Sequence, residues 1–351
     1  MQFHKYPSIT NSYSNKFISY IEEAGFATDD IVYAVQEKIH GANFAVYVDD
    51  NGAELATRGH KLSENESFYN VASIEKPLKE TAIFLFDVAK RAPLSISLKG
   101  FPDYDGYIIH GELCGGSYPD IKSQQKSVQK GVYYSPHLEF FVFDITGVYK
   151  NFVRDEDTNK MVDKHVLLDL DIAEYFTKQA GFHWTPILFE GSLDECLQVP
   201  NEFKSQIAYN LGMPEIAEPN ICEGVVIKPI KPLYLHNGSR VILKNKNEKF
   251  SEKTKAPKVV IPLTESLQRI IAEARLYVTE PRYDNVTSKM DVIDYDDKSM
   301  IGVLIKKLTH DVFAEINGEN PELFGELAKE DQKQVNRAIS SDVKKLILAK
   351  F

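Results

Sequence analysis

The sequence predicts an α+β protein, with antiparallel sheets and flanking helices followed by a mostly α-helical C-terminal domain. Up to about residue 246, short runs of β-branched and aromatic residues alternate with turn signals, as in strands. The pattern changes near Lys255-Ala256-Pro257-Lys258, after which apolar residues recur at helical spacing. A chain of 351 residues is long enough for two domains. We therefore predict one domain over 1–257 and a helical domain over 258–351.

The order of elements follows from these patterns and from glycine, proline and turn signals. In the first part we predict a helix over 14–24 ended by Gly25, strands over 31–35 and 44–48, a hairpin turn at 49–52 with a return strand over 54–59, and a helix over 64–92. Next come strands over 107–116 and 140–145, a helix over 163–180 ended by Gly181, and strands over 224–228 and 241–246. Helical spacing then covers 263–278, 300–316 and 321–351.

The charge distribution argues against a protein that binds nucleic acid over its whole surface. The formal net charge is -10, yet residues 228–258 contain nine Lys or Arg and two Glu. Such a run is often a solvated face. Because this one alternates with apolar residues in strand fashion, we expect part of it to point into a cleft.

Cysteine content and hydropathy predict a cytoplasmic protein. The three cysteines are far apart in the sequence, which favours a reducing compartment without a disulfide framework or a structural zinc site. The N-terminus has no apolar signal core, and no stretch approaches the about 18 apolar residues of a membrane span.

Residues Glu37-Lys38-Ile39-His40-Gly41-Ala42-Asn43 join two predicted strands and carry the first functional signal. Lys38 stands at a strand end, near a glycine that permits a tight turn or a close backbone approach. A lysine in such a place can act as a nucleophile if its surroundings keep the amine partly neutral. The alternative is a solvated lysine in a hairpin turn.

Further short motifs follow in order along the chain: Arg58, Gly111-Glu112, Phe141-Val142-Phe143-Asp144, Glu223 to Lys228, and Lys244-Asn245-Lys246. Together with the Lys38 segment, their order and spacing resemble the covalent nucleotidyltransferases, the superfamily of ATP-dependent ligases and mRNA capping enzymes. The sequence is most similar to the nick-sealing, double-strand-specific RNA ligases of T4-like phages. The resemblance covers nearly the whole chain and implies a monomeric ATP-dependent ligase that uses Mg²⁺, or Mn²⁺, and acts on nicked duplex RNA.

The resemblance implies a role for each lysine of these motifs. Lys38 would attack the ATP α-phosphorus and carry AMP, while Lys244 and Lys246 bind phosphates and Lys228 lies near the nucleotide. The i, i+2 spacing of Lys244 and Lys246 puts both on one face of a strand. The surrounding cations would favour the neutral amine of Lys38. Lys244 and Lys246 could instead be surface lysines.

By the same resemblance, the acids, Arg58 and Phe143 complete a nucleotide site. Glu223 would help to hold the metal, Glu112 would contact the ribose, Arg58 would contact the nucleotide, and Phe143 would stack on adenine. Asp144 would be an essential site residue. The alternatives are an exposed strand glutamate for Glu223 or Glu112, a turn acid for Asp144, and plain core packing for Phe143.

The remaining site residues also come from the resemblance. His40 and Asn43 would act in phosphate contact and the sealing steps. Glu37 and Ile39 would border the ATP site. The alternative for His40 is a histidine in a turn whose ring is hydrogen-bonded to the backbone. In the helical domain, Arg282, Asp311 and Glu315 match positions used for nick recognition, although ordinary helix-surface charges look the same.

Two departures and two rival functions accompany this interpretation. The family usually has Thr where Ala42 stands and often has Lys where Thr57 stands. These departures affect details of substrate contact. A DNA ligase or a capping enzyme is the alternative within the superfamily, but it would append a β-barrel rather than helices. A non-catalytic RNA-binding module is the alternative outside it.

Overall fold

The computed structural model describes residues 1–64, 66–91, 104–122, 126–154, 161–250, 266–290, 293, 299–319 and 329–350. The chain divides into two compact units, Met1–Asn247 and Glu248–Phe351. The division falls earlier than the boundary expected at residue 257, which itself lies outside the described residues. None of the described helices is long and apolar enough to cross a membrane.

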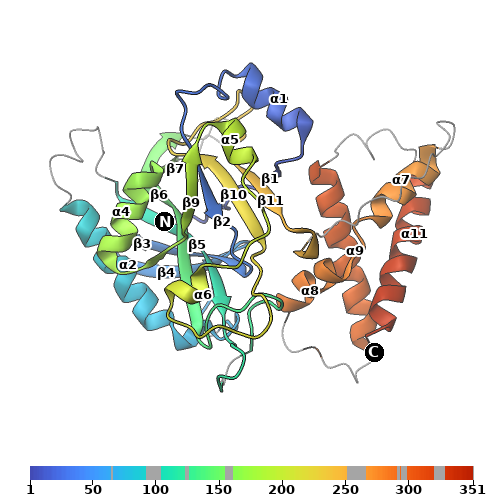
Figure 1. Cartoon of the computed structure of the whole chain (residues 1–351). Helices are drawn as coiled ribbons and strands as arrows, with labels where there is room; N and C mark the ends of the chain where they lie inside the picture. Colours follow the sequence, from blue (N-terminus) through green and yellow to red (C-terminus); the bar gives the residue numbers. More distant parts are fainter. Residues whose placement is uncertain are drawn as a thin grey trace. The chain divides into compact units, whose positions relative to one another are not determined.

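The first unit contains a five-stranded sheet in the order β1-β11-β10-β2-β9 (Figure 1). Its strands are β1 (Thr10–Asn11), β2 (Tyr33–Glu37), β9 (Ile187–Gly191), β10 (Gly224–Pro229) and β11 (Leu243–Lys246). All neighbours pair antiparallel except β1 and β11. One face is apolar and packs against α1 (Asn15–Glu23) and α5 (Leu193–Leu197). Alternation along the strands therefore leaves the other face for polar side chains.

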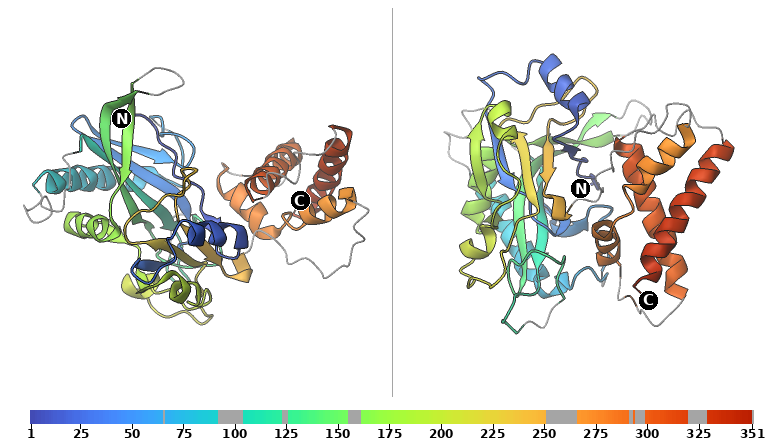
Figure 2. Two further views of the ribbon diagram at one scale, coloured as in Figure 1. Left: turned by 90° about the horizontal axis from the view of Figure 1, so that it is seen from above. Right: turned by 45° about the vertical axis from the view of Figure 1, so that its right-hand side comes forward.

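The second sheet of this unit has the order β4-β3-β5-β6-β7, with β8 (His183–Trp184) added beside β6. Its strands are β3 (Ala42–Asp49), β4 (Gly52–Thr57), β5 (Gly106–Gly115), β6 (Leu138–Arg154) and β7 (Met161–Leu167). Helices α2 (Glu75–Lys90) and α4 (Leu170–Ala180) pack with one face of this sheet in the largest hydrophobic core, as the views in Figure 2 also show. A short helix, α6 (Ile207–Asn210), and the 3₁₀ turns η1 (Val71–Ser73) and η2 (Glu248–Phe250) are the other elements among the described residues up to 250.

Several predicted elements are confirmed. Helix α1 ends just before Gly25, whose φ of +72° suits a glycine, and the turn at 49–52 joins β3 to β4. The predicted strands over 107–116, 140–145 and 224–228 correspond to β5, part of β6 and β10.

Other predictions were wrong in type or extent. Residues 163–167 belong to strand β7 rather than to a helix, because they pair along β6, and the helix begins only at Leu170. Helix α2 begins at Glu75 instead of residue 64. Strand β11 begins at Leu243 rather than at residue 241. Strand β9 gave no signal that we recognised.

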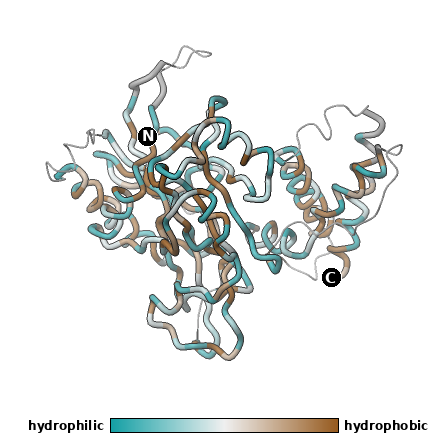
Figure 3. The backbone as a smooth tube through the Cα atoms, turned by 45° about the horizontal axis from the view of Figure 1, so that its top comes forward, coloured by the Kyte–Doolittle hydropathy of each residue, from teal (hydrophilic) through white to brown (hydrophobic). Residues whose placement is uncertain are grey.

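The described part of the second unit consists of helices: α7 (Ser266–Arg275), α8 (Glu280–Ser288), α9 (Ser299–Glu319) and α11 (Lys329–Leu348). These helices share one hydrophobic core, to which α9 contributes Leu304, Leu308, Val312 and Ile316. The i, i+4 spacing of these four residues gives α9 one apolar face, visible in Figure 3 as alternating brown and teal along the helices of this unit. The predicted helical character of this region is confirmed where the structure describes it.

Candidate active site

Lys38 lies where the chain leaves one sheet of the first unit and enters the other. Strand β2 belongs to the five-stranded sheet and β3 to the six-stranded sheet, so the two strands do not form a hairpin. The Lys38 N–H donates to Gly224 O at 2.8 Å. A Cβ on Gly41 would lie 2.2 Å from Leu113 O, so only glycine fits this close approach. The hairpin-turn alternative for Lys38 is therefore wrong.

Three basic side chains contact the Glu223 carboxylate. Its Oε2 accepts a hydrogen bond from Lys38 Nζ at 2.7 Å and lies 3.5 Å from His40 Nδ1, while its Oε1 lies 3.2 Å from Lys246 Nζ. Burial would raise the pKa of Glu223, but the charges of Lys38 and Lys246 outweigh it and hold that pKa well below its usual range. Glu223 is thus a buried carboxylate that stays ionised among cations.

The lysines after Glu223 point to one face of the five-stranded sheet. Lys246 lies opposite Gly224 and Lys244 opposite Val226, which itself lies opposite Gln36. Residues directly opposite each other share a face, and Lys228 is two positions beyond Val226 on the same strand. The predicted convergence of Lys244 and Lys246 on one face is confirmed.

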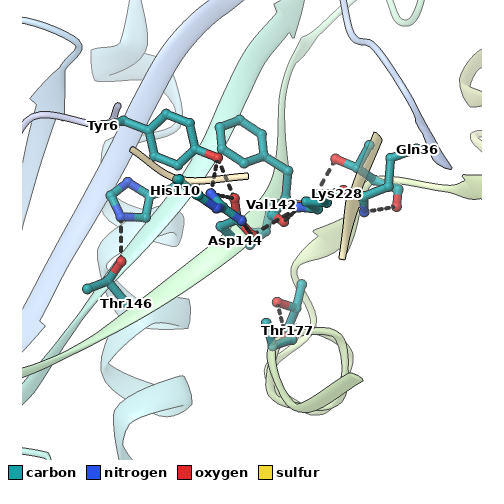
Figure 4. A network of polar contacts seen from close by, with 12 residues as sticks. Tyr6, Gln36, His110, Val142, Asp144, Thr146, Thr177 and Lys228 are labelled. Atoms are coloured by element: carbon teal, nitrogen blue, oxygen red, sulfur yellow. Dashed lines mark hydrogen bonds and ion pairs between the residues drawn. The ribbon is translucent and has the colours of Figure 1, made fainter. Parts of the chain in front are cut away.

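Asp144 is the centre of a second buried cluster. Lys228 Nζ donates to Asp144 Oδ1 at 2.9 Å, and Arg240 donates to both carboxylate oxygens at 2.8 and 3.1 Å. The Tyr6 hydroxyl also donates to Asp144 and accepts a bond from Arg240 at 2.7 Å. Figure 4 shows Tyr6 and Lys228 reaching Asp144 from different sides. Through Lys228 and Asp144, this cluster ties the two sheets together.

Burial and charge act against each other in this cluster. Burial lowers the pKa of Lys228 to about 8, although Asp144 opposes that change. Burial would raise the pKa of Asp144, but Arg240 and then Lys228 outweigh it and hold the pKa below its usual range. Asp144 is therefore an ionised anchor. Because Asp144 lies within strand β6, the turn-acid alternative is excluded.

Sequence reasoning missed Tyr6 and Arg240. Arg240 lies within the basic segment 228–258, so alternation of charge was a signal that could have found it. Tyr6 precedes all predicted elements and carried no signal. Both side chains are nearly inaccessible to solvent, at 6% for Tyr6 and 7% for Arg240, so they support Asp144 from inside the protein.

Phe143 differs from Phe140 and Phe141, the aromatic residues that precede it on its strand. Phe140 and Phe141 are buried, whereas Phe143 is only half-buried. Its ring meets the Tyr6 ring edge-on with centroids 5.2 Å apart, and Lys228 Nζ lies 6.0 Å from its centroid. This partly open ring beside the buried cluster favours a binding surface over plain core packing.

Three further predicted residues lie on the six-stranded sheet. Asn43 on β3 lies opposite Glu112 on β5, and both are half-buried. Arg58 directly follows β4 and is exposed, with one guanidinium nitrogen 3.4 Å from Ser8 Oγ. The structure thus brings Asn43 and Glu112 together, and places Arg58 at a strand end as predicted.

Glu37 and Ile39 are placed differently from Lys38. The Glu37 carboxylate is buried and accepts bonds from Ser205 Oγ at 2.5 Å and Gln206 N at 3.0 Å. Burial raises the pKa of Glu37 to about 7. The Ile39 side chain is also buried. The Glu37 carboxylate is therefore buried and bonded within the protein, unlike the Lys38 side chain that follows it.

Glu223 could hold a metal together with a substrate. Among these residues, no group of three His, Cys, Asp or Glu side chains is arranged to hold a metal ion. Mg²⁺ is commonly bound by one or two carboxylates together with substrate phosphates and water. The ionised Glu223 beside Lys38 and Lys246 fits that mode of binding.

In the helical unit, Arg282 and Asp311 form an ion pair between α8 and α9. Arg282 is 2% exposed, and its guanidinium donates to Asp311 Oδ2 at 2.7 Å. Glu315 follows Asp311 by four residues on α9, which places both on one side of the helix. The pair shows that Arg282 contributes to the packing of this unit, a role that the sequence did not indicate.

The two sheets, joined at Lys38, form the nucleotidyltransferase fold predicted from the sequence. Residues 31–246 match the family described as RNA ligase, and residues 262–345 match the domain described as T4 RNA ligase 2 C-terminal. The first match alone covers more than half of the chain, which therefore belongs to the RNA ligase family.

Known proteins with similar sequences include two ligases of Trypanosoma brucei brucei. RNA-editing ligase 1, mitochondrial, is 27% identical over 259 residues, covering 65% of this chain and 52% of that protein. RNA-editing ligase 2, mitochondrial, is 24% identical over 250 residues, with 64% and 55% covered. The chain thus spans about half the length of the curated relatives it matches.

Solved structures that this chain resembles include mutants of Naegleria gruberi RNA ligase. One, solved with AMP and Mn, is 16% identical with a TM-score of 0.40, covering 71% of this chain and 57% of that chain. Another, solved with ATP and Mn, is 16% identical with a TM-score of 0.39 and the same coverage.

Proposed function

We propose that this chain is an ATP-dependent RNA ligase, an AMP-forming polyribonucleotide ligase that seals 3′-OH/5′-phosphate nicks in duplex RNA. The observation that carries the proposal is the Lys38–Glu223 contact of 2.7 Å, made where two sheets meet in a chain of the RNA ligase family. Lys246 and His40 share the same carboxylate, so the site combines a lysine nucleophile with a cationic environment suited to phosphates.

The reaction proceeds through three phosphoryl transfers. First, Lys38 Nζ loses a proton and forms a P–N bond with the ATP α-phosphorus, while the bond to pyrophosphate breaks. Next, an RNA 5′-phosphate oxygen attacks that phosphorus, and the P–N bond to Lys38 breaks. Finally, the RNA 3′-hydroxyl attacks the activated 5′-phosphate, and AMP leaves. In each transfer, positioning and charge neutralisation supply most of the catalysis.

The side chains of the site divide these tasks. Lys244 and Lys246, which lie on β11, would bind phosphates. Lys228 would be held in position by its bond to Asp144, which Arg240 and Tyr6 also contact. The open face of Phe143 would receive the adenine, with Glu112 and Arg58 at the ribose and phosphates. Glu223 together with the nucleotide phosphates would hold Mg²⁺ or Mn²⁺. When bound, the metal supplies further charge neutralisation.

The two units would divide the work. The first unit contains all the residues proposed for nucleotide chemistry, so it would form lysine-AMP. The helical unit, including Asp311 and Glu315, would help to grip the nicked duplex in a monomeric protein. The cysteines that the structure describes are free and buried, which agrees with a reducing compartment such as the cytoplasm, our proposed location.

Labelling with ATP tests the proposal. With α-labelled ATP and magnesium, the wild type should acquire a label that survives a denaturing gel, and Lys38→Ala should acquire none. Lys38→Arg should fail too, because a guanidinium stays protonated and is a poor nucleophile. Lys76→Ala, which changes an exposed lysine of α2, is the control and should label normally.

A second measurement separates the chemical steps. Lys38→Ala should still seal a nick whose 5′ end already carries AMP, because that step does not use the nucleophile. Persistent labelling of Lys38→Ala would contradict the assignment. Sealing of an all-DNA nick as fast as the RNA nick would instead favour a DNA ligase.

A further inference from the structure

The segment 126–137, here called the His40-contacting segment, lies between β5 and β6 and carries no residue of the predicted site. It has no regular secondary structure and contains no Asp or Glu, in a chain whose net charge is -10. Its side chains sort by exposure: Val128, Gln129, Val132 and Tyr134 are buried, whereas Lys126, Lys130, Tyr133 and His137 are exposed. The segment therefore has an inner side fixed in the protein and an outer side of basic and aromatic groups.

The inner side is fastened to the nucleophile motif. The backbone carbonyl of Lys130 lies 3.1 Å from His40 Nε2, and the Tyr134 hydroxyl accepts a bond from His40 N at 2.8 Å. Gln129 Nε2 reaches Gly41 O at 3.5 Å. These three contacts place the segment directly beside the residues that follow Lys38.

A second anchor fixes the outer side. The Asn220 side chain accepts a bond from Tyr133 N at 2.9 Å and donates to Tyr133 O at 2.6 Å. The Tyr133 ring also meets the Tyr118 ring edge-on, with centroids 6.4 Å apart. The backbone of Tyr133 is thus held from both directions, while 37% of the residue remains exposed. An exposed aromatic side chain on a fixed backbone loses little freedom when a flat group stacks on it.

We propose that the His40-contacting segment binds the RNA strand that carries the 5′-phosphate, with Lys126 and Lys130 on backbone phosphates and Tyr133 on a base or sugar. The inference rests on the proposed ligase function. Transfer of AMP from Lys38 brings the RNA 5′-phosphate to the nucleophile motif, so the nucleotides behind that phosphate run over the surface beside it. Lysines bind phosphates without regard to sequence, and aromatic rings stack on any base.

Binding of RNA by the full-length protein tests the proposal. The probe is a nicked duplex RNA with a 5′-phosphate, used without ATP so that no sealing occurs, and its affinity is measured over a range of salt. In the double variant Lys126→Ala/Lys130→Ala, affinity should fall on the order of tenfold or more near 0.1 M salt. The slope of log K against log salt should become shallower by about two, since two phosphates are no longer bound and each accounts for about one.

The tyrosine has its own pair of variants. Tyr133→Ala should weaken RNA binding by about 5- to 100-fold because it removes the stacking ring, and Tyr133→Phe should restore it. As a control, Lys76→Ala/Lys178→Ala removes two exposed lysines from α2 and α4 and should leave affinity and slope unchanged. All of these variants should still take up label from ATP.

The outcomes are distinct. If the wild type seals nicks but Lys126→Ala/Lys130→Ala binds RNA with wild-type affinity and slope, this inference fails and the proposed function stands. Failure of label transfer in the segment variants would show that the segment only supports the nucleophile motif. That outcome would also overturn the inference that the segment binds RNA. A wild type that neither labels nor seals would overturn the proposed function as well.

Discussion

The two units arrange their buried charges differently. In the first unit the buried groups include acids that collect several cations: Glu223 meets Lys38, Lys246 and His40, and Asp144 meets Lys228 and Arg240. Among the described residues of the helical unit, the buried charged side chain is Arg282, and its partner Asp311 is 33% exposed.

This difference indicates different roles. Cations gathered around one carboxylate can turn to an incoming phosphate, because the phosphate replaces the carboxylate as their counter-charge. A buried arginine that meets a carboxylate at the surface links two helices and needs no ligand. We therefore interpret the cations around Glu223 as chemical and the Arg282 pair as structural, and four predictions test that comparison.

The largest effect is expected at Glu223. Glu223→Ala should depress label transfer from ATP by several orders of magnitude, because it removes the proposed metal contact, and metal neutralisation is worth several kcal/mol. Excess EDTA should stop labelling of the wild type. The control Glu80→Ala changes an exposed acid of α2. Full labelling of the wild type in EDTA would show that no metal is needed.

A chain of residues 1–250 tests whether the first unit suffices for nucleotide chemistry. It keeps both sheets and their hydrophobic cores, so it should fold, which circular dichroism can check. Labelling with ATP should stay near the wild-type extent, whereas sealing of a nicked RNA duplex should largely disappear. If the folded truncation seals as well as the full chain, the helical unit has another role.

Arg282→Ala tests whether the buried arginine is structural. We expect the helical unit to lose about 1–3 kcal/mol in its free energy of unfolding, because the change removes a buried side chain and its ion pair. Label transfer should not change. Arg275→Ala breaks a more exposed pair with Asp342 in the same unit and should cost about 0–1 kcal/mol. A stable Arg282→Ala protein that fails to seal would instead make Arg282 an RNA contact.

The last prediction concerns the pH dependence of stability at Glu37. Its pKa is raised from the ordinary 4.5 to about 7 in the folded protein, so the unfolded chain loses this proton first as pH rises. The contribution of Glu37 therefore lowers the free energy of unfolding between about pH 4.5 and 7, by up to about 1.4 kcal/mol per pH unit. Glu37→Gln should remove this slope, measured by denaturant unfolding across that range. An unchanged slope would show that Glu37 is ionised in the folded state.

The sequence by itself determined the class of fold and indicated where a nucleotide site would lie. The resemblance of short motifs to those of the nucleotidyltransferases pointed to Lys38, Glu223, Lys244 and Lys246. The shared face of Lys244 and Lys246 was predictable because a strand must place residues i and i+2 on one face whatever surrounds it. Helical periodicity likewise determined the character of the second unit, since an apolar face at 3.6-residue spacing has to be buried. These features are local, so they do not depend on which distant residues the chain contacts.

Only the tertiary structure decided which residues meet. Strands β2 and β3 are neighbours in sequence, but they enter different sheets, and the pairing partners that decide this come from distant parts of the chain. Residue 6 and residue 240 reach Asp144, and residues 126–137 reach His40, across separations that no periodicity encodes. Burial of Arg282, too, depends on how α8 packs on α9. Long-range packing, rather than local preference, therefore determined the surroundings of each charge.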